Sequence, residues 1–200
     1  MQKKLFFAFL FLTLSSLFWS GNFLTGKLAF NNDLSPFKLS FFRWLLAFMV
    51  LLPFTIREIL SSFDLYIKNI FLMIILSILG IAIFNSFTYI SLRTTLVINS
   101  SLMTSITPIL IIFFSWLIFK TKTDSIQFLG IFLSLFGTLC IVLKGNINNL
   151  FNLNLIPGDI WMFVAVLCWS LYSVLLKKID KNLSQLATLE ILIFIGLIFI

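Results

Sequence analysis

Charge is scarce in this sequence, and histidine is absent. Lys, Arg, Asp and Glu together make up 10% of the 200 residues, whereas apolar residues make up 60% and the mean hydropathy is +1.13. Soluble domains carry about 25% charged residues, enough to cover their surface. This chain has too little polar surface to face water, so we expect an all-α polytopic transmembrane helical bundle surrounded by membrane lipid.

The same absences exclude several kinds of site. Without histidine there is no imidazole for a metal site, a Ser-His catalytic pair or a proton relay. No paired aspartates lie inside an apolar run, and no G-x-x-x-x-G-K-[ST] loop is present. The two cysteines, Cys140 and Cys168, lie in apolar runs and are expected to pack as small hydrophobic residues. We therefore expect no enzyme, and no cofactor, metal or catalytic residue.

The net charge of +7 raises nucleic-acid binding as an alternative. The basic residues, however, lie between apolar segments and are not gathered on one face or tail. That pattern is typical of membrane topology, in which cytoplasmic loops retain Lys and Arg. With the N-terminus in the cytoplasm, nine of the 14 basic residues fall inside. We therefore predict a multi-pass protein of the inner (plasma) membrane with a cytoplasmic N-terminus and no nucleic-acid partner.

Six apolar runs approach or exceed the length of about 20 residues that a membrane-crossing helix needs, and a seventh, shorter run follows them. They cover residues 5–26, 39–56, 69–92, 94–119, 125–143, 160–176 and 191–200, and only Arg43 interrupts one of them. The last run reaches about 15 Å, half of the ~30 Å hydrocarbon layer. We therefore expect the sequence to be a piece of a longer protein, with all seven acidic residues in loops or near helix ends.

A weak internal repeat becomes visible when the sequence is shifted by 150 residues. The residues that then coincide are Leu17, Trp19, Ser20 and Lys27 with Leu167, Trp169, Ser170 and Lys177. One period contains five helices, and an odd number forces the second copy to enter the membrane from the opposite side. Residues 1–145 are predicted to form a first five-helix repeat. Residues 157–200 are predicted to begin an inverted second repeat with one full and one incomplete helix, so that about seven of ten helices are present. Inverted repeats are typical of secondary transporters that bind substrate near the midplane.

Several motifs in this chain resemble EamA-type carriers of the drug/metabolite transporter superfamily. They are Phe18-Trp19-Ser20-Gly21-Asn22-Phe23 with Gly26-Lys27-Leu28-Ala29, Ser35-Pro36-Phe37 with Arg43, Trp44 and Ala47, the stretch from Asn99 through Pro108 to Trp116 with Gln127, Gly130 and Gly137, and Gly158-Asp159 with Cys168-Trp169-Ser170-Leu171-Tyr172. The resemblance covers nearly the whole chain. It implies ten helices in two inverted halves, both termini in the cytoplasm, and transport of small metabolites. The sequence departs from the family where Lys120-Thr121-Lys122 replaces an acidic residue, and the family's last three helices are absent.

Arg43 is the only charge well inside a predicted span. It lies about 10 Å into its helix when counted from Pro36 at 1.5 Å per residue. An Arg at the centre of a membrane helix costs about 2.5–3.5 kcal/mol on insertion scales. Two interpretations stay open: the guanidinium contacts an anionic or carboxylate group in a central cavity, or it extends to the outer headgroups.

Other polar side chains within the spans are candidates for substrate binding or for lining a cavity. Asn22, Asn85 and Asn99 carry amides that are unfavourable in lipid, so each is expected to face protein or a wet cavity. Interhelical hydrogen bonding and substrate contact are both open interpretations for them. Tyr89 and Tyr172 add hydroxyls to aromatic faces, which suits solutes of mixed polarity.

Trp19 and Trp169 occupy equivalent repeat positions and could wall the same cavity, although Trp is also common at membrane interfaces. Pro108 interrupts the fourth span and frees the carbonyl of Thr104, which Thr104 and neighbouring hydroxyl residues are expected to help satisfy. Kinked helices of this kind commonly line transport pathways. The glycines of the spans, by contrast, are expected to permit close helix contacts: Gly80, Gly130 and Gly137.

These features predict a secondary transporter of small metabolites that works by alternating access across the inner membrane. Amino acids or related solutes, or drug-like compounds, are the expected substrates, and Arg43 favours those that carry a carboxylate. A non-transporting membrane scaffold or an inactive truncated fragment is the alternative, but the scaffold explains neither the repeat nor the polar, proline-broken fourth span. The sequence leaves open whether the protein also forms a homodimer.

Overall fold

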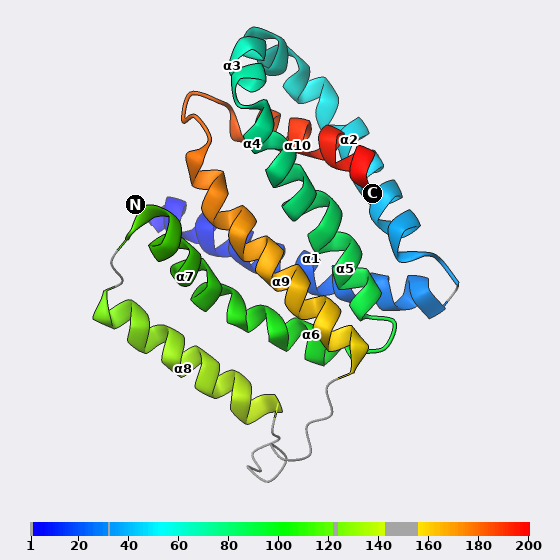
Figure 1. Ribbon diagram of the computed structural model, residues 1–200, viewed down its shortest axis with the longest axis vertical. Helices are drawn as coiled ribbons and strands as arrows, with labels where there is room; N and C mark the ends of the chain where they lie inside the picture. Colours follow the sequence, from blue (N-terminus) through cyan, green and yellow to red (C-terminus); the bar gives the residue numbers. More distant parts are fainter. Residues whose placement is uncertain (1, 32, 122–123, 143–155) are drawn as a thin grey trace.

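The computed structural model describes residues 2–31, 33–121, 124–142 and 156–200, and within these ranges the chain is helical with no strand (Figure 1). The elements are α1 (Gln2–Asn31), α2 (Pro36–Ser61), α3 (Phe63–Lys68), α4 (Ile70–Leu76), the π-helix η1 (Ser77–Ile83), α5 (Phe84–Ser91), α6 (Val97–Met103), the 3₁₀-helix η2 (Thr104–Ile106), α7 (Thr107–Phe119), α8 (Ser125–Val142), α9 (Pro157–Leu175), the 3₁₀-helix η4 (Leu176–Lys178) and α10 (Gln185–Phe199). The predicted all-α class is confirmed.

In the described part of the chain, five helical segments are long and apolar enough to cross a membrane. They are Leu5–Phe30, Pro36–Ser61, Ile70–Ser91, Val97–Phe119 and Pro157–Lys178, and two shorter apolar helices cover Ser125–Thr138 and Gln185–Phe199. Large apolar side chains cover much of the outer surface. In water such a surface would aggregate, whereas in lipid it is the expected exterior. The fold is therefore that of a polytopic membrane bundle.

Helix starts and stops in this chain follow local chemistry. Pro36 and Pro157 are the first residues of α2 and α9, where the missing proline N–H would have no helical partner. Lys120 ends α7 in the left-handed conformation, with φ 54° and its N–H bonded to the carbonyl of Trp116. These stops divide the apolar sequence into separate helices.

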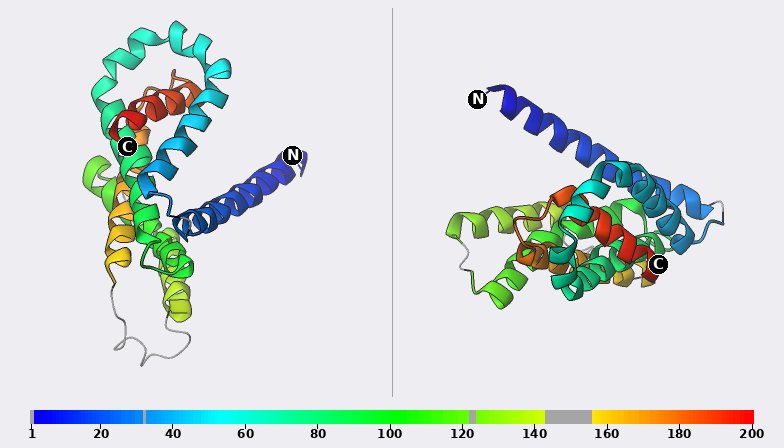
Figure 2. Two further views of the ribbon diagram at one scale, coloured as in Figure 1. Left: turned by 90° about the vertical axis from the view of Figure 1, so that its right-hand side faces the viewer. Right: turned by 90° about the horizontal axis from the view of Figure 1, so that it is seen from above.

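Helix α9 lies at the centre of the bundle and packs against α5 and α7 (Figure 1). Helix α10 crosses α2 and η1. Helix α1 diverges from the bundle toward its N-terminal end, as both views of Figure 2 show, and contacts α2, α5 and α6. The interior that these helices enclose contains residues from both ends of the chain.

The start of α9 is fixed against the turn that follows α5. A carboxylate oxygen of Asp159 accepts a hydrogen bond of 2.8 Å from the hydroxyl of Thr95, and the other accepts one of 3.2 Å from the N–H of Ile156. Gly158 lies so close to this turn that a Cβ there would be 2.5 Å from the carbonyl oxygen of Ser91. Only glycine fits this approach without a shift of the backbone.

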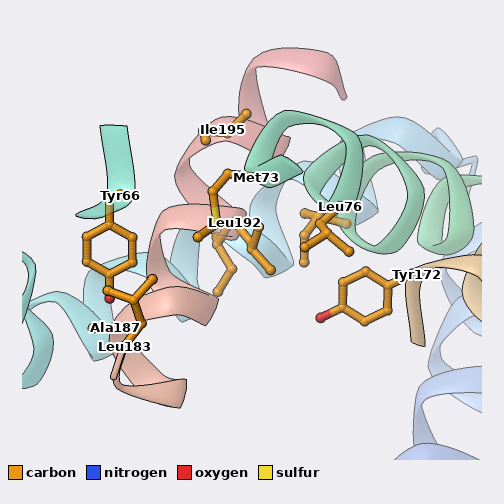
Figure 3. Close-up of a cluster of buried hydrophobic side chains, with 10 residues drawn as sticks. Tyr66, Met73, Leu76, Tyr172, Leu183, Ala187, Leu192 and Ile195 are labelled. Atoms are coloured by element: carbon orange, nitrogen blue, oxygen red, sulfur yellow. The ribbon is translucent and has the colours of Figure 1, made fainter. Parts of the chain in front are cut away.

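Two clusters of buried apolar side chains hold the bundle together. The larger one joins α3, α4, η1, α9 and α10, and comprises Tyr66, Met73, Leu76, Ile81, Tyr172, Leu183, Ala187, Leu192, Ile193 and Ile195. Figure 3 shows Tyr66 lying over Leu183 and Ala187, and Tyr172 next to Leu76. The smaller cluster comprises Phe23, Tyr89, Leu92, Met162 and Val166, and joins α1 and α9 to α5.

The expectation that every acidic residue lies in a loop or near a helix end is wrong for Glu190. Helix α10 begins at Gln185, directly after Ser184, and not after Glu190. Glu190 therefore lies in the second turn of this apolar helix, and its side chain is only 1% exposed. In the sequence, the charge of Glu190 looks like the boundary of the apolar run. The tertiary packing of α10 instead buries this residue within the helix.

Candidate solute site

The guanidinium of Arg43 points into the bundle. One terminal nitrogen donates a hydrogen bond of 2.7 Å to the Oδ1 of Asn22 on α1, and the other donates to the Oδ1 of Asn85 on α5. The guanidinium carbon also lies 4.9 Å from the ring centre of Trp44 and 5.4 Å from that of Tyr89. Of the two interpretations of Arg43, extension to the outer headgroups is therefore wrong.

Tyr89 completes a polar network of four residues. Its hydroxyl donates a hydrogen bond of 2.5 Å to the same Oδ1 of Asn22 that accepts from Arg43. The network thus joins α1, α2 and α5 through four side chains, each of which the sequence predicts separately as a candidate site residue. Interhelical hydrogen bonding, one of the two interpretations of Asn22 and Asn85, is present.

The charge of Arg43 is not neutralised within this network. Both acceptors of its guanidinium are neutral amide oxygens. Its third nitrogen, Nε, is buried and has no hydrogen-bond partner among the residues that the structure describes. A guanidinium is a planar fork of donors that matches a carboxylate well. The network therefore holds a positive charge that none of its own members neutralises.

The helix that carries Asn85 is distorted in a way that serves the network. Residues Ser77–Ile83 form a π-helix, and the amide nitrogen of Asn85 donates to the carbonyl oxygens of Gly80 at 2.9 Å and Ile81 at 3.2 Å. These bonds orient the amide so that its oxygen faces Arg43. Segments of π-helix are rare and are frequent at functional sites. The sequence does not predict this element, because Ser77–Ile83 is an ordinary part of an apolar run.

An aromatic stack lies beside the polar network. The ring of Phe84 is 5.7 Å from that of Trp19 and 4.5 Å from that of Trp169, and both pairs are stacked. Trp169 also stacks on Tyr172 at 5.1 Å, and Trp19 lies 6.1 Å from Trp169. Phe84 was missed, since nothing in the sequence distinguishes it from the other 25 phenylalanines.

A cavity of about 830 Å³ is lined in part by the rings of this stack. Its aromatic and apolar lining comprises Trp19, Phe23, Leu24, Phe84, Val97, Ile98, Pro108 and Trp169, and its hydroxyl lining comprises Ser15, Ser16, Ser20, Ser101, Thr104, Ser105, Thr107 and Ser134. Cavities of about 300–1,000 Å³ with mostly apolar walls and a few polar groups are typical of small-molecule sites. Four predicted residues line it: Trp19, Thr104, Pro108 and Trp169.

The break in the fourth span forms the hydroxyl-rich side of the cavity. Residues Thr104–Ile106 tighten into a 3₁₀ turn, and Pro108 follows in the first turn of α7. The N–H of Thr107 donates to the carbonyl of Thr104, and the hydroxyl of Thr104 donates to the carbonyl of Ser101 at 2.5 Å. The carbonyl that Pro108 frees is thus satisfied by the backbone of this turn.

Residues 6–143 match the EamA-like transporter family. The chain belongs to this family. Among curated relatives, the uncharacterized transporter YyaM of Bacillus subtilis is 32% identical over 129 residues, which cover 64% of this chain and 42% of that protein. An uncharacterized transporter of Archaeoglobus fulgidus is 28% identical over 174 residues, or 84% of this chain and 57% of that protein. The chain spans about half the length of the curated relatives it matches. No solved structure matches it.

Membership of the EamA-like transporter family, together with the apolar helices, makes this a multi-pass membrane protein of a transporter family. The same membership favours a non-enzymatic role. The resemblance noted from the motifs is therefore confirmed at the level of the family.

Two expectations about this EamA-like chain are wrong. Asn99 is exposed, and in the described part of the chain its amide neither bonds to another residue nor lines the cavity. It lies in the first turn of α6, close to the end of the span, where water or headgroups can bind an amide. Gly130 and Gly137 make no close helix contact, because nothing in the described structure lies within 4 Å of a Cβ built on either. Gly80 does make a close helix contact, because a Cβ there would be 2.6 Å from the ring of Tyr172.

Proposed function

We propose that this chain acts in a secondary carrier that moves small metabolites across the inner membrane by alternating access. The observation that supports the proposal most is a cavity of about 830 Å³ lined by the aromatic stack, on the same helices whose amides hold the uncompensated guanidinium of Arg43. Trp19 and Phe84 line the cavity, while Asn22 and Asn85 on the same two helices hold Arg43. Charge and space therefore lie next to each other within the apolar bundle.

The chemistry of this arrangement favours a solute with both a carboxylate and an apolar or hydroxyl-bearing part, such as an amino acid or a related metabolite. A carboxylate could replace the amide oxygens of Asn22 and Asn85 at the fork of Arg43, because a charge-assisted pair is stronger than a bond to a neutral amide. The aromatic faces and serine hydroxyls of the cavity would contact the rest of the solute. Drug-like compounds are a broader class that the same walls could hold.

The proposed mechanism rests on the inverted repeat. Trp19 and Trp169 are equivalent in the predicted repeat, and their rings lie 6.1 Å apart. Residues next to a two-fold axis contact their own symmetry equivalents, so this contact is what an inverted pair of copies predicts. Rocking of one copy against the other would then open the site to each side in turn.

The proposed orientation has the N-terminus in the cytoplasm. The turn between α2 and α4, the end of α7 and the end of α9 then lie on the cytoplasmic side. The basic residues at these places are Arg57, Lys68, Lys120, Lys177, Lys178 and Lys181. Their position follows the preference of cytoplasmic loops for Lys and Arg.

Transport in whole cells tests the proposal. Cells that produce the full-length natural protein are compared with cells that lack it for uptake and efflux of labelled amino acids and related carboxylate metabolites. Arg43→Gln is measured beside Arg57→Gln, which removes an exposed charge near the end of the same helix. Bonds to charged groups contribute about 1.5–3 kcal/mol, so we expect transport of a carboxylate solute by Arg43→Gln to fall by about tenfold or more. Wild-type rates in Arg43→Gln, or no difference between producing and non-producing cells, would contradict the proposal.

A further inference from the structure

Glu190 is an acidic side chain buried in an apolar helix without a partner. It is 1% exposed, and both of its carboxylate oxygens lack a hydrogen bond to any residue that the structure describes. An isolated carboxylate transferred from water to an apolar interior is so costly that the group binds a proton instead. Its surroundings therefore favour the uncharged acid, with the proton on one of the two oxygens.

The neighbours of Glu190 offer no compensating charge. It lines a cavity of about 330 Å³ together with Phe48, Leu52, Ile56, Ile59, Phe63, Tyr66, Ile67, Ile70, Ile191, Phe194 and Ile195. Tyr66 of α3 is the titratable residue of this set, and the residues that α2, α4 and α10 add to the lining are apolar. Neither α4 nor η1 contains a titratable residue. The charged residues of α2 are Lys38, Arg43, Arg57 and Glu58, and none of them lines this cavity.

A metal cation does not fit this place. Hard cations take six or more oxygen ligands in proteins, and the lining offers one carboxyl and one phenol. In the ranges that the structure describes, no three His, Cys, Asp or Glu side chains come together. A proton needs a single oxygen, so it is the cation that Glu190 can bind alone.

We propose that Glu190 is a proton-binding site whose charge state controls how α10 is seated against α2 and α3. In the seated state the carboxyl carries the proton. When the O–H bond breaks, the proton passes to water. The remaining carboxylate must then become hydrated or move out of its apolar surroundings. Binding of a proton reverses both steps, and no other reactant is needed.

Movement of α10 would reach the candidate solute site through two contacts. Helix α10 packs along α2, which carries Arg43, and along η1, whose carbonyls orient Asn85. Gly196 of α10 faces Ile81 of η1, where a Cβ would be 2.5 Å from the Ile81 side chain. The proton site and the guanidinium network are thus connected through α2 and η1, both of which pack against α10. This coupling rests on the proposed carrier function, whereas proton binding by Glu190 does not.

Infrared spectroscopy of the full-length protein in phospholipid bilayers tests the site, with protons and deuterons as the probe. The wild-type protein is expected to show the C=O band of a protonated carboxyl at pH 7, shifted in heavy water. Glu190→Gln should lose the band, Glu190→Asp should retain it at an altered position, and Glu58→Gln, which changes an exposed carboxylate, should keep it unchanged. Absence of the band at pH 7, or its persistence in Glu190→Gln, would overturn the proposal.

Thermal unfolding tests the link to packing in the same samples. Between pH 5 and pH 7 the melting temperature of the wild type and of Glu58→Gln should fall as the pH rises, because the unfolded chain releases the proton of Glu190 more readily than the folded protein does. Glu190→Gln should lose this slope. An equal slope in all three proteins would refute the control of packing. Neither measurement needs a solute, so a negative transport result would count against the carrier function alone.

Discussion

The rings of Trp19 of α1 and Trp169 of α9 lie with their centres 6.1 Å apart, and each of them also stacks on the ring of Phe84. The two tryptophans belong to the first and sixth apolar runs of the sequence and occupy equivalent positions in the predicted repeat. Their contact places the wall of the cavity at the meeting point of the two proposed copies.

Removal of Trp169 should destabilise the bundle. The ring stacks on both Phe84 and Tyr172, and each aromatic pair contributes about 0.5–1.5 kcal/mol beyond its buried area. Trp169→Ala is therefore expected to lower the melting temperature of the purified protein in detergent by several degrees. Trp116→Ala is the matched control, because that ring on α7 is 52% exposed. Equal shifts for the two variants would show that the stack does not stabilise the fold.

The polar network should be sensitive to loss of Asn85. Asn85→Ala leaves a guanidinium nitrogen of Arg43 without its acceptor and removes the side-chain bond to the carbonyl of Gly80. A buried polar group left unpaired costs about 1–3 kcal/mol. We expect Asn85→Ala to lower the melting temperature clearly, and Asn99→Ala, at an exposed amide, to leave it unchanged. A larger drop in melting temperature for Asn99→Ala than for Asn85→Ala would contradict the buried position of Asn85 and the exposed position of Asn99.

Much of this site follows from the cost of polar groups in lipid. Asn22 and Asn85 are each unfavourable alone in an apolar span, and the sequence therefore predicts that both face protein or a cavity. For Arg43 the sequence leaves extension to the headgroups equally open. Which residue meets which depends on how α1, α2 and α5 pack, and hydropathy contains no information on that packing. Asn99 escapes the rule because it lies close to a helix end.

Other features depend on tertiary contacts from the start. The π-helix at Ser77–Ile83 forms where Tyr172 packs on Gly80, two residues that lie in different predicted repeats. Glu190 interrupts an apolar run and therefore looks like a boundary, and only the packing of α10 makes it a buried acid. Phe84 belongs to the site because Trp19 and Trp169 stack on its ring, and its residue type alone does not indicate this.

Two glycines should respond in opposite ways to the same change. Gly158→Ala places a Cβ 2.5 Å from the carbonyl oxygen of Ser91, and overpacking of this kind typically costs about 1–3 kcal/mol. Gly137→Ala meets nothing within 4 Å and replaces a poor helix former, so it should be neutral or stabilise by up to about 1 kcal/mol. Both are measured by thermal unfolding. A stabilised Gly158→Ala protein would mean that α9 does not begin against the turn after α5.

Tyr66 should make stability depend on alkaline pH. Burial raises the pKa of its phenol, which lies on α3 between two spans and is 3% exposed. The folded protein then keeps a proton that the unfolded chain loses near pH 10, so stability falls as the pH rises above about 10. Tyr66→Phe should flatten this part of the profile in unfolding experiments from pH 8 to pH 11. Superimposable profiles for the two proteins would contradict the buried position of the phenol.

The central claim is that the hydroxyl-lined cavity beside Trp19 and Trp169 is a water-accessible path for solute, and thiol labelling tests it most directly. With Cys140 and Cys168 replaced by serine, single cysteines are introduced at Ser101 and Thr104 in the cavity, and at Leu129, an exposed apolar position on α8. A membrane-impermeant thiol reagent is applied to the full-length protein in membranes. We predict that the cysteines at 101 and 104 react much faster than the one at 129. Equal rates at the three positions, or no reaction in the cavity, would contradict the account.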